Sequence, residues 1–112
     1  MKLIVTKFGG TSVGTIDRIK SVAKRIKNEV NNGYNVIVVV SAMAGETNRL
    51  IKLVESLTND YRTSEYDTVI SSGEQVTSGL LAIALKELGI KSKSYQGWQI
   101  PFETDNNFSK AN

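Results

Sequence analysis

The chain has 112 residues, of which 40% are hydrophobic and 22% are charged, and its formal net charge at pH 7 is +3. This length suits one domain with its own core, and the composition is ordinary for a globular protein. The sequence contains no cysteine and no histidine, which excludes disulfides, zinc or thiolate metal sites and a Ser-His-Asp triad.

Membranes and nucleic acids are not expected partners. The sequence has no apolar run long enough to span a bilayer and no secretory signal pattern at its start, so we expect a cytoplasmic location. The basic residues lie mostly along one helical stretch, without interleaved aromatic residues or a known nucleic-acid motif. A solvated helix face explains them better than nucleic-acid binding.

Residues 2–7 form a predicted strand, because they are a short run rich in branched side chains that ends at two glycines. The stretch at its end is Lys7-Phe8-Gly9-Gly10-Thr11-Ser12-Val13-Gly14. Backbone N–H groups, a following helix N-terminus and a lysine ammonium group all favour an anion such as a nucleotide phosphate. For a lysine and two glycines alone, a tight turn with an exposed lysine is the more common explanation.

This loop differs from two well-known phosphate loops. Gly9 and Gly14 have the spacing of the P-loop glycines, but Thr15 stands where that motif has its lysine. The Rossmann pattern fails because Gly9 and Gly10 are adjacent and a threonine replaces the next glycine. In this chain the lysine precedes the glycines, where its flexible side chain can reach a transferring phosphoryl group.

A helix is predicted after the loop, with Thr15 as its N-cap and Asp17 favourably placed in the first turn. Gly33 is expected to end this helix in a left-handed conformation. Apolar residues at helical spacing predict one buried stripe: Ile16, Ile19, Val22, Ala23, Ile26 and Val30.

Residues 36–40 are five consecutive aliphatic residues, and they predict a central strand of a parallel sheet with helices on both faces. The strand, helix and strand together predict a βαβ unit. The second strand leads into a loop of small residues at 41–48. Because ligands of open α/β sheets collect at the carboxyl ends of the strands, we expect this loop to adjoin the loop after the first strand.

The remaining elements are a helix at 48–57, a helix at 64–88 with a polar interruption at 71–74, and a third strand at 90–95. Residues 96–112 are polar and rich in turn-forming residues. A sheet of three strands is incomplete for an α/β domain. The residues expected to face inward are Leu50, Ile51, Val54 and Leu57 in the first of these helices, and Val76, Leu80, Leu81, Ile83, Ala84 and Leu88 in the second.

Three polar residues in these segments have two explanations each. Ser41 and Thr47 are either ligand-binding hydroxyls or residues that satisfy backbone groups in turns. Glu74, in the interruption, either binds a substrate ammonium group or sits in the first turn of a new helix.

Taken in order, these motifs resemble the N-terminal half of the catalytic domain of aspartokinases. The resemblance covers nearly the whole chain, and the Lys-Phe-Gly-Gly-Thr-Ser block is its most specific part. Other amino-acid kinases share the lysine and glycine but lack the Thr-Ser continuation and the Ser-Ala-Met block. The matching segments are Lys7 to Val13, Val38 to Met43, Thr47-Asn48, Ser72 to Gln75, Leu80 to Ala82, Gly97-Trp98-Gln99 and Thr104-Asp105.

The resemblance implies a three-layer αβα sandwich with a mainly parallel sheet. It implies transfer of the γ-phosphoryl group of ATP, accompanied by Mg²⁺, to the side-chain carboxylate of L-aspartate, which is the first step towards lysine, methionine and threonine. Lys7 and Ser41 would be catalytic, Lys7, Phe8, Gly9 and Gly10 would bind the ATP phosphates, and Thr47 and Glu74 would bind aspartate. No residue is expected to ligate a metal by itself.

The departure from the family is length. Residues 1–112 correspond to the N-terminal part of an amino-acid kinase catalytic domain, without the later part of the site and without regulatory ACT domains. We therefore expect a complementary kinase fragment or a homo-oligomer as partner. The alternatives are a truncated, non-catalytic α/β fragment and a sister amino-acid kinase with another acceptor.

Overall fold

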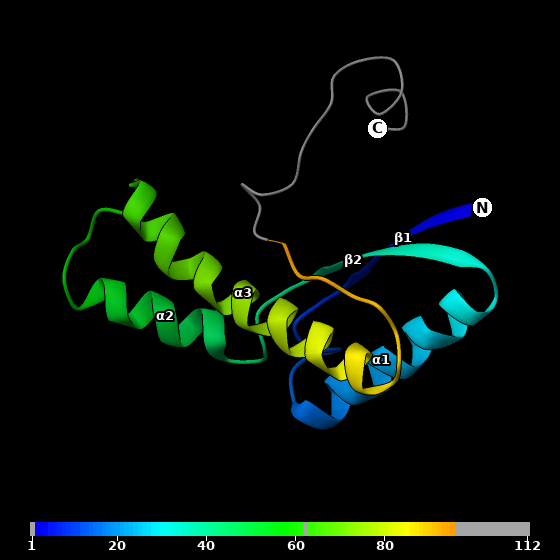
Figure 1. Ribbon diagram of the computed structural model, residues 1–112. Coiled ribbons are helices and arrows are strands. Elements are labelled where there is room, and N and C mark those ends of the chain that lie inside the picture. The colour runs from blue at the N-terminus through cyan, green and yellow to red at the C-terminus, as the bar shows by residue number, and fades with distance from the viewer. Residues whose placement is uncertain (1, 62, 96–112) are drawn as a thin grey trace, which may run out of the picture.

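The computed structural model describes residues 2–61 and 63–95, and this part of the chain forms two strands and three helices, whose arrangement can be followed in Figure 1. None of these helices is both long and apolar enough to cross a membrane. The order of elements confirms an α/β protein that begins with a βαβ unit. The elements are β1 (Lys2–Phe8), α1 (Ile16–Asn31), β2 (Tyr34–Val40), α2 (Glu46–Glu55) and α3 (Ser64–Glu87).

The two strands pair in parallel, with Lys2 opposite Tyr34 and Phe8 opposite Val40. Side chains alternate between the two faces of a strand, so paired residues share a face. The covered face, which lies against the helices, carries Ile4, Thr6, Phe8, Val36, Val38 and Val40. The open face carries Leu3, Val5, Lys7, Asn35, Ile37 and Val39.

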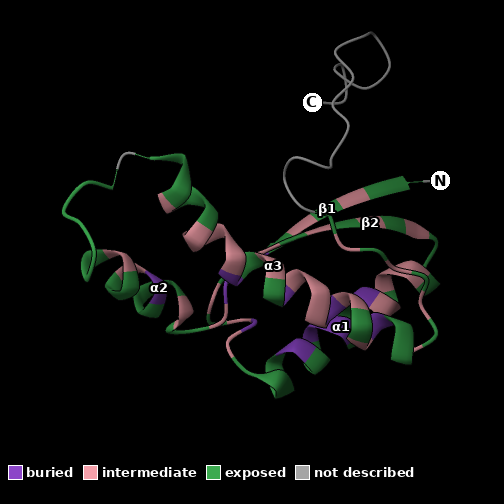
Figure 2. Ribbon diagram, turned by 60° about the vertical axis from the view of Figure 1, so that its left-hand side comes forward, coloured by how far each residue is buried: buried purple, intermediate pink, exposed green. Residues whose placement is uncertain are grey.

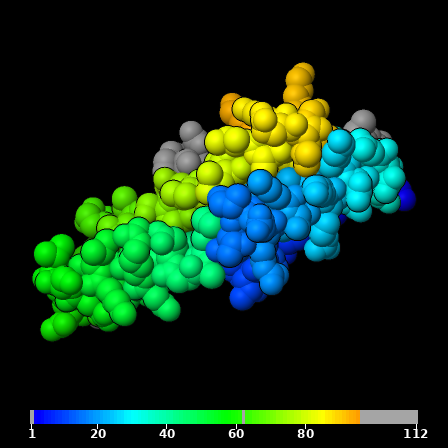
Figure 3. All heavy atoms as spheres, turned by 90° about the horizontal axis from the view of Figure 1, so that it is seen from below, coloured from blue at the N-terminus to red at the C-terminus, as the bar shows by residue number. Residues whose placement is uncertain are grey.

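Two helices pack against the covered face. Figure 3 shows α1 and the C-terminal half of α3 side by side, whereas α2 and the first half of α3 extend beyond them. The buried residues gather where α1 and α3 meet, as Figure 2 shows. This core consists of Phe8, Val13, Ile19, Val22, Ala23, Ile26, Leu81 and Leu85.

The open face differs from what the aliphatic run at 36–40 predicts. Its side chains are substantially exposed: Val5 by 63%, Leu3 by 56%, and Ile37 and Val39 by 46% each. The described residues therefore form two layers, a sheet and one layer of helices. Coverage of β2 on both faces, as the sequence predicts, is not found within this part of the chain.

The local signals around α1 are confirmed. The Thr15 hydroxyl accepts a hydrogen bond from the Arg18 N–H at 3.2 Å, which makes it the N-cap, and Asp17 lies in the first turn. Gly33 follows the helix with a φ of 94°, in the left-handed region. The predicted stripe is buried or partly buried except at Ile16, which is 50% exposed because it is the first residue of the helix.

The predicted interruption at 71–74 is wrong, because α3 continues through it. The hydroxyl groups there donate to carbonyl groups of the same helix: Ser71 to Thr68 at 3.2 Å, and Ser72 to Val69 at 2.6 Å. They therefore leave the helical backbone bonds in place. Glu74 consequently lies in the middle of a long helix, which excludes its placement in a first turn.

The third strand predicted at 90–95 is also wrong, since this described segment has no strand. The Ile90 N–H donates to the Leu85 carbonyl at 2.9 Å, and the Ser92 hydroxyl donates to the Ala82 carbonyl at 2.8 Å. These bonds hold the segment against α3. A groove of about 650 Å³ lies between it and β2. The remaining predictions for 96–112 fall outside the described residues.

Besides Ile16, three residues predicted to face inward are exposed: Leu57 by 89%, Ile83 by 60% and Val76 by 55%. Leu57 lies beyond the end of α2, which spans 46–55 and starts two residues earlier than the sequence predicts. On α3, the buried residues Gly73, Thr77, Leu81 and Leu85 recur every four positions. Val76 and Ile83 fall off this stripe.

Candidate functional site

Three segments that carry the sequence motifs meet at the carboxyl ends of the strands: the loop after β1, the loop after β2 and the middle of α3. The Ser41 N–H donates to the Phe8 carbonyl at 3.1 Å. A Cβ atom on Gly10 would lie 3.3 Å from the Ala42 carbonyl oxygen, and one on Gly14 would lie 3.0 Å from the Ala44 Cβ. The predicted proximity of the two loops is confirmed.

The loop after β1 is a compact turn. The Gly9 carbonyl accepts from the N–H groups of Ser12 and Val13, at 3.0 and 3.3 Å. The Val13 side chain is fully buried and anchors the loop in the core. The N–H groups of Gly10, Thr11 and Gly14 have no acceptor within the described residues. Because unpaired N–H groups in a turn form a concavity for anions, this loop is suited to bind phosphate oxygens.

The two residues before these glycines have different environments. Lys7 is exposed, and it extends from the open face of the sheet at the end of β1. Phe8 is 8% exposed and packs in the core, with the Arg25 guanidinium 5.4 Å from the centre of its ring. Only the backbone of Phe8 is therefore available to a ligand, and its carbonyl already holds the loop after β2.

The loop after β2 is shorter than the sequence predicts. Gly45, at a φ of 81°, ends it, and α2 begins at Glu46. Thr47 consequently lies in the first turn of a helix, whereas the sequence predicts it in the loop before a helix that begins at Asn48. Ser41 is partly buried at the start of the loop, and the Thr47 side chain is exposed.

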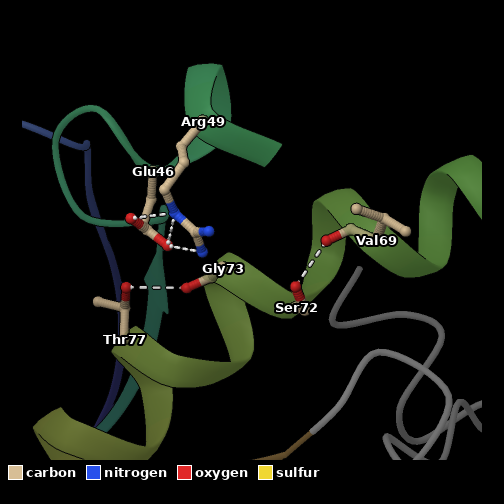
Figure 4. Close-up of polar contacts among 6 residues, drawn as sticks. All are labelled: Glu46, Arg49, Val69, Ser72, Gly73 and Thr77. Atoms are coloured by element: carbon tan, nitrogen blue, oxygen red, sulfur yellow. Dashed lines mark hydrogen bonds and ion pairs between the residues drawn. The ribbon is translucent and has the colours of Figure 1, made fainter. Parts of the chain in front are cut away.

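An ion pair lies in the first turn of α2. Arg49 donates two hydrogen bonds to Glu46 Oε1, from Nη2 at 2.7 Å and from Nε at 3.1 Å, and Nε also lies 3.1 Å from Oε2 (Figure 4). These hydrogen bonds lower the pKa of Glu46 and raise the pKa of Arg49. Glu46 therefore stays ionised beside Thr47.

Glu74 is exposed on α3, directly after a buried glycine. A Cβ atom on Gly73 would lie 2.9 Å from the Ala42 Cβ, 3.3 Å from Leu50 Cδ1 and 3.9 Å from the Glu46 Cβ. Gly73 thus brings α3 against both the loop and α2. Within the described part of the chain, no hydrogen bond joins Thr47 to Glu74.

The candidate residues lie outside two hollows of the described part of the chain, residues 2–61 and 63–95. One hollow is bordered by residues 58–61, and the groove beside β2 is bordered by that strand, α3 and residues 89–95. Neither is lined by Lys7, Ser41, Thr47 or Glu74. Among the described residues, no three acidic side chains are close enough together to hold a metal ion.

Two residues of this region were not among the predicted site residues. Gly14 has almost no space for a side chain, because a Cβ atom would lie 2.9 Å from the Gly10 carbonyl oxygen. Gly73 is equally tight against Ala42. Both glycines belong to recognisable motifs, but contacts between distant segments are not visible in one sequence.

Comparison with known proteins gives consistent matches. A model described as the amino acid kinase family matches residues 2–112. The aspartokinase of Rickettsia felis is 57% identical over 114 residues, which cover 99% of this chain and 28% of that protein. An aspartate kinase of Stutzerimonas stutzeri is 50% identical over 111 residues, covering 99% and 27%.

A solved structure agrees with these matches. The crystal structure of an aspartate kinase from Synechocystis superposes with a TM-score of 0.74 at 45% sequence identity, and covers 79% of this chain. The match includes 15% of that kinase chain. The chain therefore spans little more than a quarter of the curated relatives named above, and a smaller share of the solved structure.

Proposed function

Because the chain belongs to the amino acid kinase family, we propose that it forms one part of an aspartate kinase site. The proposed reaction moves the γ-phosphoryl group of ATP to the side-chain carboxylate of L-aspartate and gives 4-phospho-L-aspartate. The names of the relatives support aspartate as the acceptor. The observation that carries the proposal is the meeting of the loops after β1 and β2, through the 3.1 Å bond from Ser41 to Phe8.

The phosphate side of the proposed site is the loop after β1. The N–H groups of Gly10, Thr11 and Gly14 lack acceptors in the described chain, so they can donate to phosphate oxygens. The backbone of Gly9 is accessible to a phosphate group, since nothing lies within 4 Å of a Cβ placed on this residue. The backbone of Phe8 fixes the start of the loop. Mg²⁺ would arrive with ATP and neutralise phosphate charge.

Lys7 and Ser41 are the proposed catalytic residues. Lys7 carries a full positive charge at the strand end, where its flexible side chain can reach the phosphoryl group in transfer. Ser41 stands at the start of the neighbouring loop, where its hydroxyl can orient phosphate or acceptor oxygens. An aspartate carboxylate is already ionised at neutral pH and needs no general base, so positioning and charge stabilisation are sufficient chemistry.

Thr47 and Glu74 are the proposed aspartate-binding residues. Both side chains are exposed. Thr47 follows Glu46 on α2, Glu74 follows Gly73 on α3, and Glu46 and Gly73 lie at the contact between the two helices. The Glu74 carboxylate would pair with the α-ammonium group of aspartate. The Thr47 hydroxyl lies at a helix N-terminus, where the helix dipole favours a substrate carboxylate.

The proposed partner is the remainder of a kinase domain. The chain spans 28% of the Rickettsia felis aspartokinase, and the open face leaves Leu3, Val5, Ile37 and Val39 about half exposed. An apolar sheet face of this kind is typical of an interface. The added layer would complete the αβα sandwich and the opposite wall of the site.

The test is phosphoryl transfer after complementation. The chain is mixed with the part of the Rickettsia felis aspartokinase that it does not match, and acyl phosphate formed from ATP and aspartate is trapped as a hydroxamate. We expect activity in the mixture. Lys7→Ala should lower it by about 10²–10³-fold, whereas Lys2→Ala, at the other end of the same strand, should leave it unchanged.

Three outcomes would contradict parts of this proposal. Equal activity of Lys7→Ala and the unchanged chain would remove Lys7 from the catalytic role. Full activity of the chain alone would show that no partner is needed. Transfer to N-acetylglutamate in preference to aspartate would identify a sister kinase with another acceptor.

A further inference from the structure

Gly73 lies at the closest contact between α3 and the loop after β2. A Cβ atom at this position would lie only 2.9 Å from the Ala42 Cβ, which is closer than real Cβ atoms approach. It would also lie 3.3 Å from Leu50 Cδ1 on α2. All three residues are buried, and Ala42 and Leu50 are only 4% and 6% exposed. The loop and α2 are therefore packed against the bare backbone of α3.

The conformation of Gly73 does not explain why glycine occupies the position. Its φ is not in the positive region, where Gly33, Gly45 and Gly89 lie. It lies in the interior of α3, where glycine is a poorer helix former than alanine. The close approach of the Ala42 and Leu50 side chains to the backbone of α3 is the remaining reason for a glycine.

One turn further along α3, Thr77 bonds to the carbonyl group of Gly73. Its side chain is fully buried, and its hydroxyl donates to the Gly73 carbonyl at 3.2 Å, as Figure 4 shows. The hydroxyl is thereby satisfied within α3, and the carbonyl at the contact has a second donor besides the helical N–H group. No polar group of the Thr77 side chain is therefore left without a partner at this contact.

The contact joins the segments that carry the proposed aspartate-binding residues. Glu74 follows Gly73 on α3, and the Glu46 Cβ, next to Thr47, would lie 3.9 Å from a Cβ at Gly73. Ser41 precedes Ala42 in the loop. A change in spacing between Gly73 and Ala42 therefore moves Glu74 relative to Ser41 and Thr47.

We infer that Gly73 is a positioning residue for the acceptor half of the site, because its missing side chain sets the distance between Glu74 and the loop that carries Ser41. This inference rests on the proposed aspartate kinase function. A displacement of about 1 Å in such an arrangement lowers turnover by roughly 10²-fold.

The test is a double-mutant cycle with Gly73→Ala, Ala42→Gly and the double variant. Ala42→Gly removes the methyl group that the new side chain would meet, so the double variant restores the space. Gly79→Ala is the matched control, because Gly79 lies in the same helix and nothing lies within 4 Å of a Cβ placed on it. Both glycine-to-alanine changes alter helix propensity in the same way.

Two measurements are made on each variant. The first is kcat, together with the KM for aspartate and for ATP, in the complemented mixture. We expect Gly73→Ala to lower kcat by roughly 10²-fold and to raise the aspartate KM by about tenfold, with a smaller change in the ATP KM. The double variant should recover most of the loss, and Gly79→Ala should match the unchanged chain. The second measurement is the set of amide NMR shifts of residues 41–47 in the chain alone.

The outcomes separate this inference from the proposed function. An unchanged aspartate KM in Gly73→Ala, or a double variant that recovers nothing, overturns the inference. If no mixture is active, the proposed function fails. The amide NMR shifts of residues 41–47 then still show whether a side chain at position 73 displaces the loop after β2. The inference is supported if the shifts of residues 41–47 change in Gly73→Ala and return to those of the unchanged chain in the double variant. It is overturned if Gly73→Ala gives the same shifts at these residues as the control Gly79→Ala.

Discussion

The two faces of the β1–β2 sheet are built from similar side chains but have different environments. On the covered face, Phe8 is 8% exposed and lies in the core formed with α1 and α3. On the open face, aliphatic residues of the same strands are 46–63% exposed. The aliphatic run of β2 makes both faces of the strand apolar, and the described residues cover only one of them.

The candidate site residues at the end of β1 also lie on different faces of the sheet. Lys7 belongs to the open face, whereas its neighbour Phe8 belongs to the covered face. Stability of the chain should therefore depend on covered residues, and activity and association on open ones. Substitutions on opposite faces test this division directly.

The largest expected effect is on the covered side. Ile19 is 2% exposed in the core, so Ile19→Ala should lower the free energy of unfolding by about 3 kcal/mol. Ile37 is 46% exposed on the open face, and Ile37→Ala should cost about 1 kcal/mol. Urea unfolding followed by circular dichroism measures both values. Equal losses at the two positions would mean that the open face is buried in solution.

The next effect concerns association. Val5→Thr and Val39→Thr keep the shape of two open-face side chains and replace one methyl group of each with a hydroxyl group. We expect a small change in stability, because both positions contact solvent in the chain alone. Affinity for the remainder of the kinase domain should fall by about tenfold, as two buried hydroxyls lose water without gaining partners.

Isothermal titration calorimetry with the remaining part of the Rickettsia felis aspartokinase measures this affinity. Val36→Thr on the covered face is the control, and it should reduce the stability of the chain itself. Sedimentation of the chain alone at several concentrations shows whether a second copy covers the open face instead. Unchanged affinity in the double open-face variant would place the interface elsewhere.

The sequence was sufficient to predict the elements whose cause is local. The N-cap at Thr15, the left-handed Gly33 and the apolar stripe of α1 all depend on neighbours within a few residues. The proximity of the two loops followed from the general topology of parallel strands. Long-range packing was predicted less well. Serine hydroxyls at 71–72 bond within α3, so a stretch that looks like a break stays helical.

In the candidate site, too, the sequence indicated candidate residues better than it predicted their packing. Motifs indicated Lys7, the glycines after it, Ser41, Thr47 and Glu74, and the structure describes all of them. The sequence could not show that Phe8 points into the core, or that Thr47 lies in the first turn of a helix. It also could not show that Gly73 is packed tightly and Gly79 is not, because the close approach of Ala42 and Leu50 is a contact between distant segments.

The smallest expected effect has the opposite sign and comes from one polar atom on the covered face. Thr6 Oγ1 is buried, and no hydrogen-bond partner for it exists in the described part of the chain. A buried hydroxyl without a partner costs free energy, so Thr6→Val should stabilise the chain by about 1 kcal/mol. Thr6→Ser keeps the hydroxyl and removes a methyl group, so it should destabilise by about 1 kcal/mol. Chemical unfolding measures the change in the free energy of unfolding for both variants. A loss of stability in Thr6→Val would mean that the Thr6 hydroxyl has a partner in solution, such as a buried water.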